Sequence, residues 1–60
     1  MKLFAICYGL EGRNHLIEAS NSELAIVEAS KLFDLGEREY IEVYEITLNG
    51  VPGSPNWIKQ

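Results

Sequence analysis

The chain has 60 residues and a formal net charge of −4, with 47% hydrophobic and 23% charged residues. This composition is typical of a folded globular protein, and the length allows one domain over residues 1–60. Such a short chain has little stability to spare, because it buries only about 60% of the surface that its unfolded form exposes. Oligomerisation, a metal ion or disulfides commonly support domains of this size.

The residue composition argues against disulfides, a structural metal site, a membrane span and direct nucleic-acid binding. Cys7 is the only cysteine, so no disulfide forms and a reducing compartment, the cytoplasm, is expected. One Cys and one His cannot supply the four ligands of a structural zinc, so no metal is expected. The longest apolar run, residues 3–8, is too short for a membrane span or a signal peptide. No basic run is present, which argues against direct nucleic-acid binding.

The first two elements are predicted to form a β-hairpin. Residues 2–8 are rich in apolar and β-forming side chains, and residues 14–19 form a second such run. Between them lie Gly9 and Gly12, which indicate a turn. These glycines do not form a phosphate-binding loop, since they lack the strand-to-helix context and the lysine, so no cofactor is expected. The first run is apolar on both faces, as a central strand should be.

A helix is predicted to follow. Ser20 and Glu23 match a capping box, which would start the helix at Asn21. At 100° per residue one 120° stripe of the helix contains Ala25, Ile26, Ala29, Leu32 and Phe33. Gly36 is placed to end the helix in the left-handed conformation.

The last part of the chain is predicted to be extended. Residues 39–48 carry the β-branched and aromatic side chains of a third strand, and Asn49-Gly50 is typical of a hairpin turn. Pro52 and Pro55 limit any fourth strand, so residues 51–54 are expected to be a short edge segment or loop and residues 56–59 a last extended piece. A right-handed crossover then predicts an α+β fold, β-β-α-β with an optional terminal strand, antiparallel sheet order 2-1-3 and one helix on one face.

The two faces of the first hairpin follow from a loop centred on Glu11. One face would carry Leu3, Ala5, Cys7, His15, Ile17 and Ala19, and the other Phe4, Ile6, Tyr8, Asn14, Leu16 and Glu18. The smaller residues of the first face suit close approach of the helix, which would leave the second face open. An exposed apolar patch of this kind marks a contact surface for a protein partner or a homodimer, with Trp57 covering one edge.

The predicted partner-binding residues come from two surfaces. The open face would contribute one set, together with a tyrosine of the third strand, and a ridge outside the core stripe of the helix would contribute the other. The alternative for the ridge is that scattered exposed aliphatic side chains are ordinary. The two sets together are Phe4, Ile6, Tyr8, Leu16 and Tyr44, and Leu24, Val27 and Leu35.

Two further patterns have a functional and a structural interpretation. The predicted register places Cys7 opposite His15, as a thiol nucleophile with its base would be. The favoured interpretation is that Cys7 is an inert small hydrophobe beneath the helix, and no catalytic residue is predicted. The acidic residues of the second half could mimic nucleic acid, but a net charge of −4 favours ordinary solvated faces. They are Asp34, Glu37, Glu39, Glu42 and Glu45.

Residues 15–33, followed by a strand over residues 40–48 and the Asn49-Gly50 turn, resemble small proteins encoded by bacteriophages and prophages, including some anti-CRISPR proteins of similar size. The resemblance implies a non-enzymatic inhibitor that binds and blocks a host or defence protein in the host cytoplasm. Members that obstruct nucleic-acid channels often use groups of lysines, whereas this acidic chain has three lysines far apart in its sequence, so no functional residues are carried over. The alternatives are a self-associating accessory domain that forms a homodimer without an inhibitory target and, remotely, a Cys-His enzyme.

Overall fold

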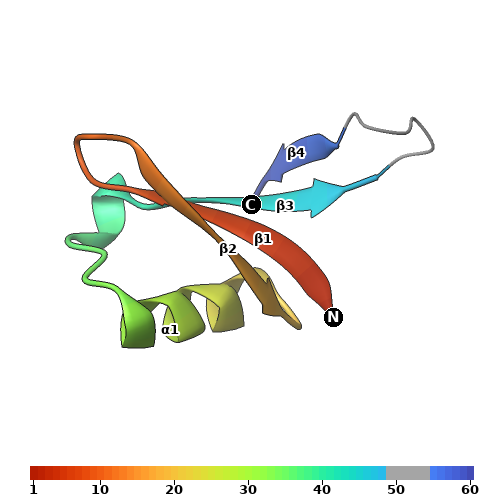
Figure 1. Ribbon diagram of the computed structural model, residues 1–60, viewed down its shortest axis with the longest axis horizontal. Helices are drawn as coiled ribbons and strands as arrows, with labels where there is room; N and C mark the ends of the chain where they lie inside the picture. The colour runs from red at the N-terminus through yellow and green to blue at the C-terminus, as the bar shows by residue number, and fades with distance from the viewer. Residues whose placement is uncertain (49–54) are drawn as a thin grey trace.

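Two strands, one helix and two further strands follow one another along the chain (Figure 1). The computed structural model describes residues 1–48 and 55–60, so the predicted Asn49-Gly50 turn and the segment 51–54 lie outside the described residues. The elements are β1 (Lys2–Tyr8), β2 (Arg13–Ala19), α1 (Ser22–Leu32), a 3-10 helix η1 (Arg38–Tyr40), β3 (Glu42–Thr47) and β4 (Asn56–Lys59). The predicted α+β fold is confirmed, and the optional terminal strand forms.

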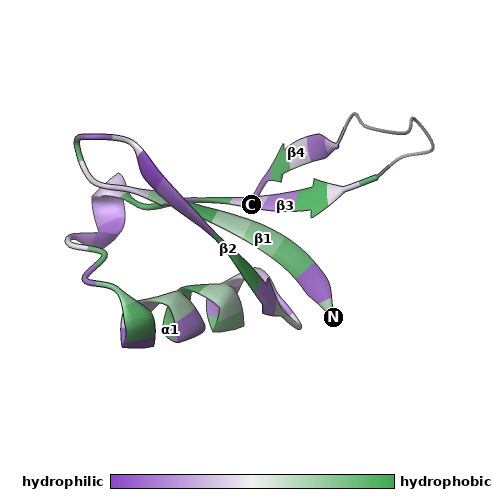
Figure 2. Cartoon of the chain, viewed as in Figure 1, coloured by the Kyte–Doolittle hydropathy of each residue, from purple (hydrophilic) through white to green (hydrophobic). Residues whose placement is uncertain are grey.

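The strands make one sheet in the order β2-β1-β3-β4, with every neighbouring pair antiparallel. β1 therefore lies in the interior of the sheet, as its run of apolar residues predicts (Figure 2). Phe4, Ala5 and Ile6 in its middle have at most 1% of their surface exposed. A strand with neighbours on both sides and side chains buried on both faces needs no polar alternation, which explains its sequence.

The β1–β2 turn contains four residues and sets the register of the hairpin. Tyr8 pairs with Arg13, and the amide of Gly12 donates to the carbonyl oxygen of Gly9 at 3.2 Å. Both glycines have a positive φ, 78° and 70°, which residues with a side chain rarely adopt. Cys7 consequently pairs with Asn14 and not with His15, so the predicted register was wrong by one residue. A slip of one residue moves every side chain of β2 to the other face.

The helix packs on the face that carries the large side chains of β1, not on the face predicted. Ala25 and Ala29 are fully buried against this face of the sheet. Small side chains on the helix leave room for large ones on the strand, and this fills the interior at the density that folded proteins require. The core cluster is Phe4, Ile6, Tyr8, Ala19, Ala25, Ala29, Leu35 and Val43, with Ile17, Ile26, Phe33 and Ile41 packed against it.

Both ends of α1 differ from the prediction. Asn21 is the N-cap, and its side-chain oxygen accepts from the amide of Leu24 at 2.9 Å, so the predicted Ser20 cap was wrong. Asn caps as well as Ser, and Asn21 has the extended backbone that a cap needs. At the other end Phe33 is already extended, and its amide donates to Ala29 at 2.9 Å. Gly36 has a φ of 75° but lies in the following loop, so it is not the cap of the helix.

β3 is shorter than predicted and β4 extends the sheet. Residues 38–40 form η1, and the strand begins only at Glu42. β4 runs back along β3 and pairs Ile46 with Trp57 and Tyr44 with Lys59, which confirms the extended piece at 56–59. In the part of the chain that is described, no helix has the length and apolar character to cross a membrane.

Candidate functional site

The face of the sheet opposite α1 is the candidate site, and it is called the open face. Side chains alternate along a strand, so the pairing of the four strands decides which residues share this face. Its residues are Asn14, Leu16 and Glu18 from β2, Leu3, Ala5 and Cys7 from β1, Glu42, Tyr44 and Ile46 from β3, and Trp57 and Lys59 from β4. Apolar side chains occupy its middle, and the charged ones stand at its margins.

An apolar groove of about 650 Å³ runs across one end of the open face. Leu3 and Ile46 are neighbours across β1 and β3, and Trp57 follows Ile46 on β4. Leu16 is 58% exposed and Trp57 48%, so large apolar surfaces face solvent here. The groove is lined by Met1, Lys2, Leu3, Leu16, Glu45, Ile46, Leu48, Pro55 and Trp57.

The aromatic side chains of the open face contact each other. The ring centroids of Tyr44 and Trp57 are 5.8 Å apart with the planes tilted by 58°, an arrangement that aromatic pairs favour. The Tyr44 hydroxyl also donates to the carboxylate of Glu42. This hydrogen bond, with some desolvation and the negative charge of Glu42, raises the pKa of Tyr44. The pair of rings therefore has a defined position at the margin of the groove.

The structure divides the predicted open-face residues. Leu16 and Tyr44 do lie on the open face. Phe4, Ile6 and Tyr8 lie beneath α1 in the core and are at most 7% exposed, so their placement on the uncovered face was wrong. The cause is the choice of helix face, since β1 is apolar on both faces and its sequence does not say which face the helix covers.

The sequence interpretation missed three residues of β1 on this face, Leu3, Ala5 and Cys7, which it placed beneath the helix; Leu3 lines the groove. Trp57 was expected at one edge of the contact surface, and it lies on β4 at the edge of the sheet on the open face. One sequence pattern could have indicated the face. The two buried alanines of α1 require a surface of large side chains opposite them, and the even-numbered residues of β1 supply it.

The predicted ridge on the helix is only partly formed. Leu24 and Val27 are 46% and 47% exposed on α1. Leu35 is only 6% exposed, because α1 ends at Leu32 and the following loop turns Leu35 into the core. The helix therefore does not present the three predicted side chains together.

Cys7 and His15 lie on opposite faces of the sheet and do not form a pair. Cys7 is half-buried on the open face, between Asn14 and Glu42, and not beneath the helix as predicted. Burial raises the pKa of its thiol, and the carboxylate of Glu42 raises it further. A thiol with a raised pKa is a poor nucleophile near neutral pH.

His15 belongs to the helix side of the sheet. Its ring stacks on that of Phe33, with centroids 3.8 Å apart and planes 3° from parallel. The Tyr8 hydroxyl lies 2.9 Å from its Nε2 atom. The imidazole thus links β1, β2 and the end of α1, which is a structural arrangement and not that of a general base beside a nucleophile.

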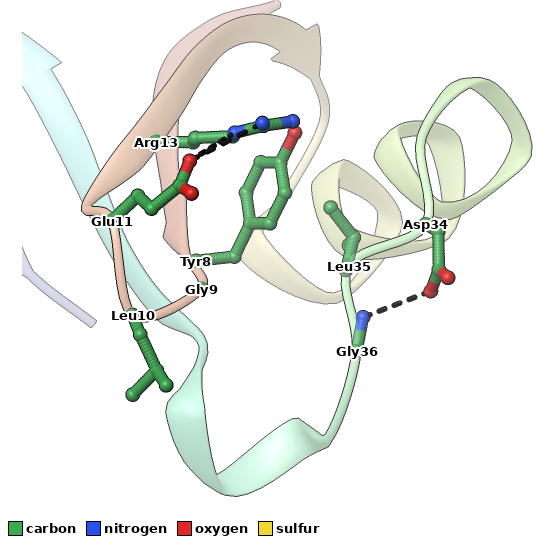
Figure 3. Close-up of a pocket in the computed structure, with 8 residues that line it drawn as sticks. All are labelled: Tyr8, Gly9, Leu10, Glu11, Arg13, Asp34, Leu35 and Gly36. Carbon is green, nitrogen blue, oxygen red and sulfur yellow. Dashed lines mark hydrogen bonds and ion pairs between the residues drawn. The ribbon is translucent and has the colours of Figure 1, made fainter.

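A smaller hollow of about 360 Å³ lies between the β1–β2 turn and the loop after α1 (Figure 3). Its polar groups are matched with each other. Arg13 pairs with Glu11 at 3.2 Å, and the carboxylate of Asp34 accepts from the amide of Gly36 at 3.1 Å. Polar groups that satisfy each other do not converge on a ligand, so this hollow is a weaker candidate than the open face. Across residues 1–48 and 55–60 no three His, Cys, Asp or Glu side chains are grouped to hold a metal ion.

Comparisons of this chain with protein-family models, with curated proteins and with solved structures found no match.

Proposed function

We propose that this chain is a small protein-binding domain and that the open face is its contact surface. The observation that supports this most is the groove formed by apolar side chains of all four strands on the side away from α1. Contiguous exposed apolar surface on a small domain usually marks a site of contact. Trp57 and Tyr44 are the residue types that most often dominate the energy of such contacts.

The sequence resemblance extends this proposal to the kind of partner. We infer a host or defence protein that is blocked when its surface is occupied, as for phage-encoded inhibitors. An apolar side chain of the partner would fill the groove between Leu16 and Trp57. Polar residues around that side chain would contact Glu18 and Lys59. The alternative is that a second copy of the chain occupies the same face, in a domain without an inhibitory target.

The test uses two adjacent residues of β4 that point to opposite faces. Trp57 lies on the open face and Ile58 on the other, and their exposed fractions are nearly equal at 48% and 47%. The parent, Trp57→Ala and Ile58→Ala are immobilised, and retained host proteins are quantified. The proposal requires one dominant protein that the parent and Ile58→Ala retain and that Trp57→Ala binds roughly 30-fold more weakly, as for a hot-spot residue.

Other outcomes would assign the function differently. If Trp57→Ala and Ile58→Ala retain the bound protein equally well, the open face is not the contact surface. If Val27→Glu loses the bound protein instead, the contact lies on the helix. Self-association of the parent that Trp57→Ala abolishes would show that a second copy covers the face.

A further inference from the structure

The outer edge of β2 is a second surface, beside the open face, with which it shares Asn14, Leu16 and Glu18. β2 is the first strand of the sheet and has β1 as its one neighbour among the described residues. All seven residues of β2 pair one-to-one with β1, without a bulge, and the strand contains no proline. β4 at the other edge has four residues and follows Pro55. Natural sheets block free edges with prolines, bulges or very short strands, and β4 follows this pattern where β2 does not.

Apolar side chains flank this unpaired edge. The helix carries Leu24, Glu28 and Leu32 at intervals of four residues, so they form one stripe. This stripe and the β2 residues Leu16, Ile17 and Glu18 line a groove of about 690 Å³ beside the strand. Leu24 is 46% exposed, Leu16 58% and Leu32 68%. A strand added at this edge would therefore gain hydrogen bonds from the backbone and cover apolar surface on both faces.

We propose that a second copy of this chain adds to this edge, β2 against β2, around a two-fold axis at Leu16. The two sheets would then form one continuous antiparallel sheet. In an antiparallel pair of β2 strands, each apolar or polar face must continue onto the same face of the partner strand. Only registers that differ by two residues satisfy this. Three registers near the middle of β2 are therefore available.

The register centred on Leu16 is self-complementary. It places Leu16 opposite Leu16 of the partner subunit, and Asn14 opposite Glu18 of the partner subunit, on the same face. The Asn14 amide can donate to that carboxylate, and the two-fold axis repeats the pair. A shift of two residues in either direction places Asn14 or Glu18 opposite a leucine. A two-fold contact between identical chains requires a self-complementary edge. A peptide from another protein would not require one.

The helices support the same arrangement. α1 packs against β2 as well as β1, so the two-fold axis brings α1 close to its counterpart on one side of the joined sheet. Leu24 and Leu32 would be covered there. Glu28 in the same stripe already has a counter-ion, since Lys31 Nζ lies 3.2 Å from its carboxylate. The dimer shares Asn14, Leu16 and Glu18 with the open face and leaves the β3 and β4 part of that face accessible, and it does not depend on the proposed function.

Sedimentation equilibrium over a dilution series measures the dissociation constant of the dimer, and substitutions of opposite charge at position 14 test it. Asn14 is exposed, so its variants should fold, and circular dichroism checks this. Asn14→Lys places a cation opposite Glu18 of the partner subunit twice and should tighten the dimer about five-fold, whereas Asn14→Glu should weaken it about five-fold. Adding Glu18→Lys to Asn14→Glu reverses the ion pair and should tighten the dimer about as much as Asn14→Lys does. Trp57→Ala, on β4 at the opposite edge of the sheet, should leave the dissociation constant of the dimer unchanged.

Hydrogen exchange gives a second readout. Alternate amides of β2, those that point to the outer edge, should become protected as concentration rises, while amides of β4 should not. A monomer at every concentration would overturn the proposal. So would a dimer that Trp57→Ala weakens and the Asn14 variants do not change, since that dimer uses the open face. Protection of β2 only when another protein is added would assign the edge to a foreign strand and would also overturn it.

Discussion

The hydroxyl of Tyr8 lies 2.9 Å from Nε2 of His15, and this contact joins the two strands of the first hairpin on the helix-covered face. Stacking of His15 on Phe33 extends the contact to the end of α1. The three rings belong to three different segments of the chain. The contact forms because Tyr8 and His15 share one face, which is a consequence of the four-residue turn between β1 and β2.

The first prediction concerns this hydrogen bond. Tyr8→Phe removes the hydroxyl and leaves the His15 nitrogen without its partner, so the free energy of unfolding should fall by about 1 kcal/mol. The melting temperature should fall by roughly 4–8 °C in a domain of this size. Tyr40→Phe is the control, since Tyr40 is 57% exposed and its variant should melt with the parent. Equal melting of all three proteins would show that the Tyr8–His15 contact adds no stability.

The second prediction concerns the start of α1. Asn21→Ala removes the side-chain oxygen that accepts from Leu24, and should lower the free energy of unfolding by about 1 kcal/mol. Ser20→Ala should have a much smaller effect, because the Ser20 side chain does not cap the helix. Urea denaturation of the two variants measures the difference. The reverse order would mean that the helix begins one residue earlier, with the capping box.

The third prediction distinguishes the two faces of the sheet by removing one methylene group from a side chain on each face. Ile6 is fully buried beneath α1, so Ile6→Val should cost about 1 kcal/mol through the lost methylene and the space it leaves. Ile46→Val on the open face should cost clearly less, because Ile46 is only partly buried. Denaturation midpoints in urea measure both. A larger loss for Ile46→Val would place the hydrophobic core on the other face.

The fourth prediction concerns alkaline pH. Folding raises the pKa of Cys7, mainly through burial, and that of Tyr44, mainly through its hydrogen bond to Glu42. The unfolded chain loses these protons first, so the stability that they contribute is complete below the unfolded-state pKa values. It is lost as pH rises above roughly 8.5, the ordinary value of a thiol, towards the folded-state values.

Glu42→Gln should make this alkaline loss of stability shallower, because the carboxylate acts on both groups. Removing its charge lowers the pKa of Cys7, so alkylation of the native thiol by iodoacetamide should become faster at mildly alkaline pH. Glu39→Gln, in η1, is the matched control and should behave as the parent. Parallel stability curves for the parent and Glu42→Gln would contradict the assigned role of this carboxylate.

Part of the candidate site could be predicted from the sequence. Leu16 and Tyr44 were expected on an open face and lie there, and Trp57 was expected at its edge. Leu16 was placed correctly because two errors cancelled: the register of β2 was one residue off, and the helix covers the other face of β1. Leu35 was misplaced because its environment depends on where α1 ends, and Phe33 leaves the helix to stack on His15.

By itself the sequence determined the type and order of β1, β2, α1 and β3, and the central position of β1, whereas it left β4 optional and did not predict η1. Local propensity and apolar runs within one segment were sufficient for these, together with the handedness of the crossover. Which face the helix covers was decided only in three dimensions. Side chains alternate with a period of two, so a turn one residue shorter or longer exchanges the faces of β2. The fit of Phe4 and Ile6 against Ala25 and Ala29 selected the face of β1, and such a fit exists only when segments far apart in the sequence come together.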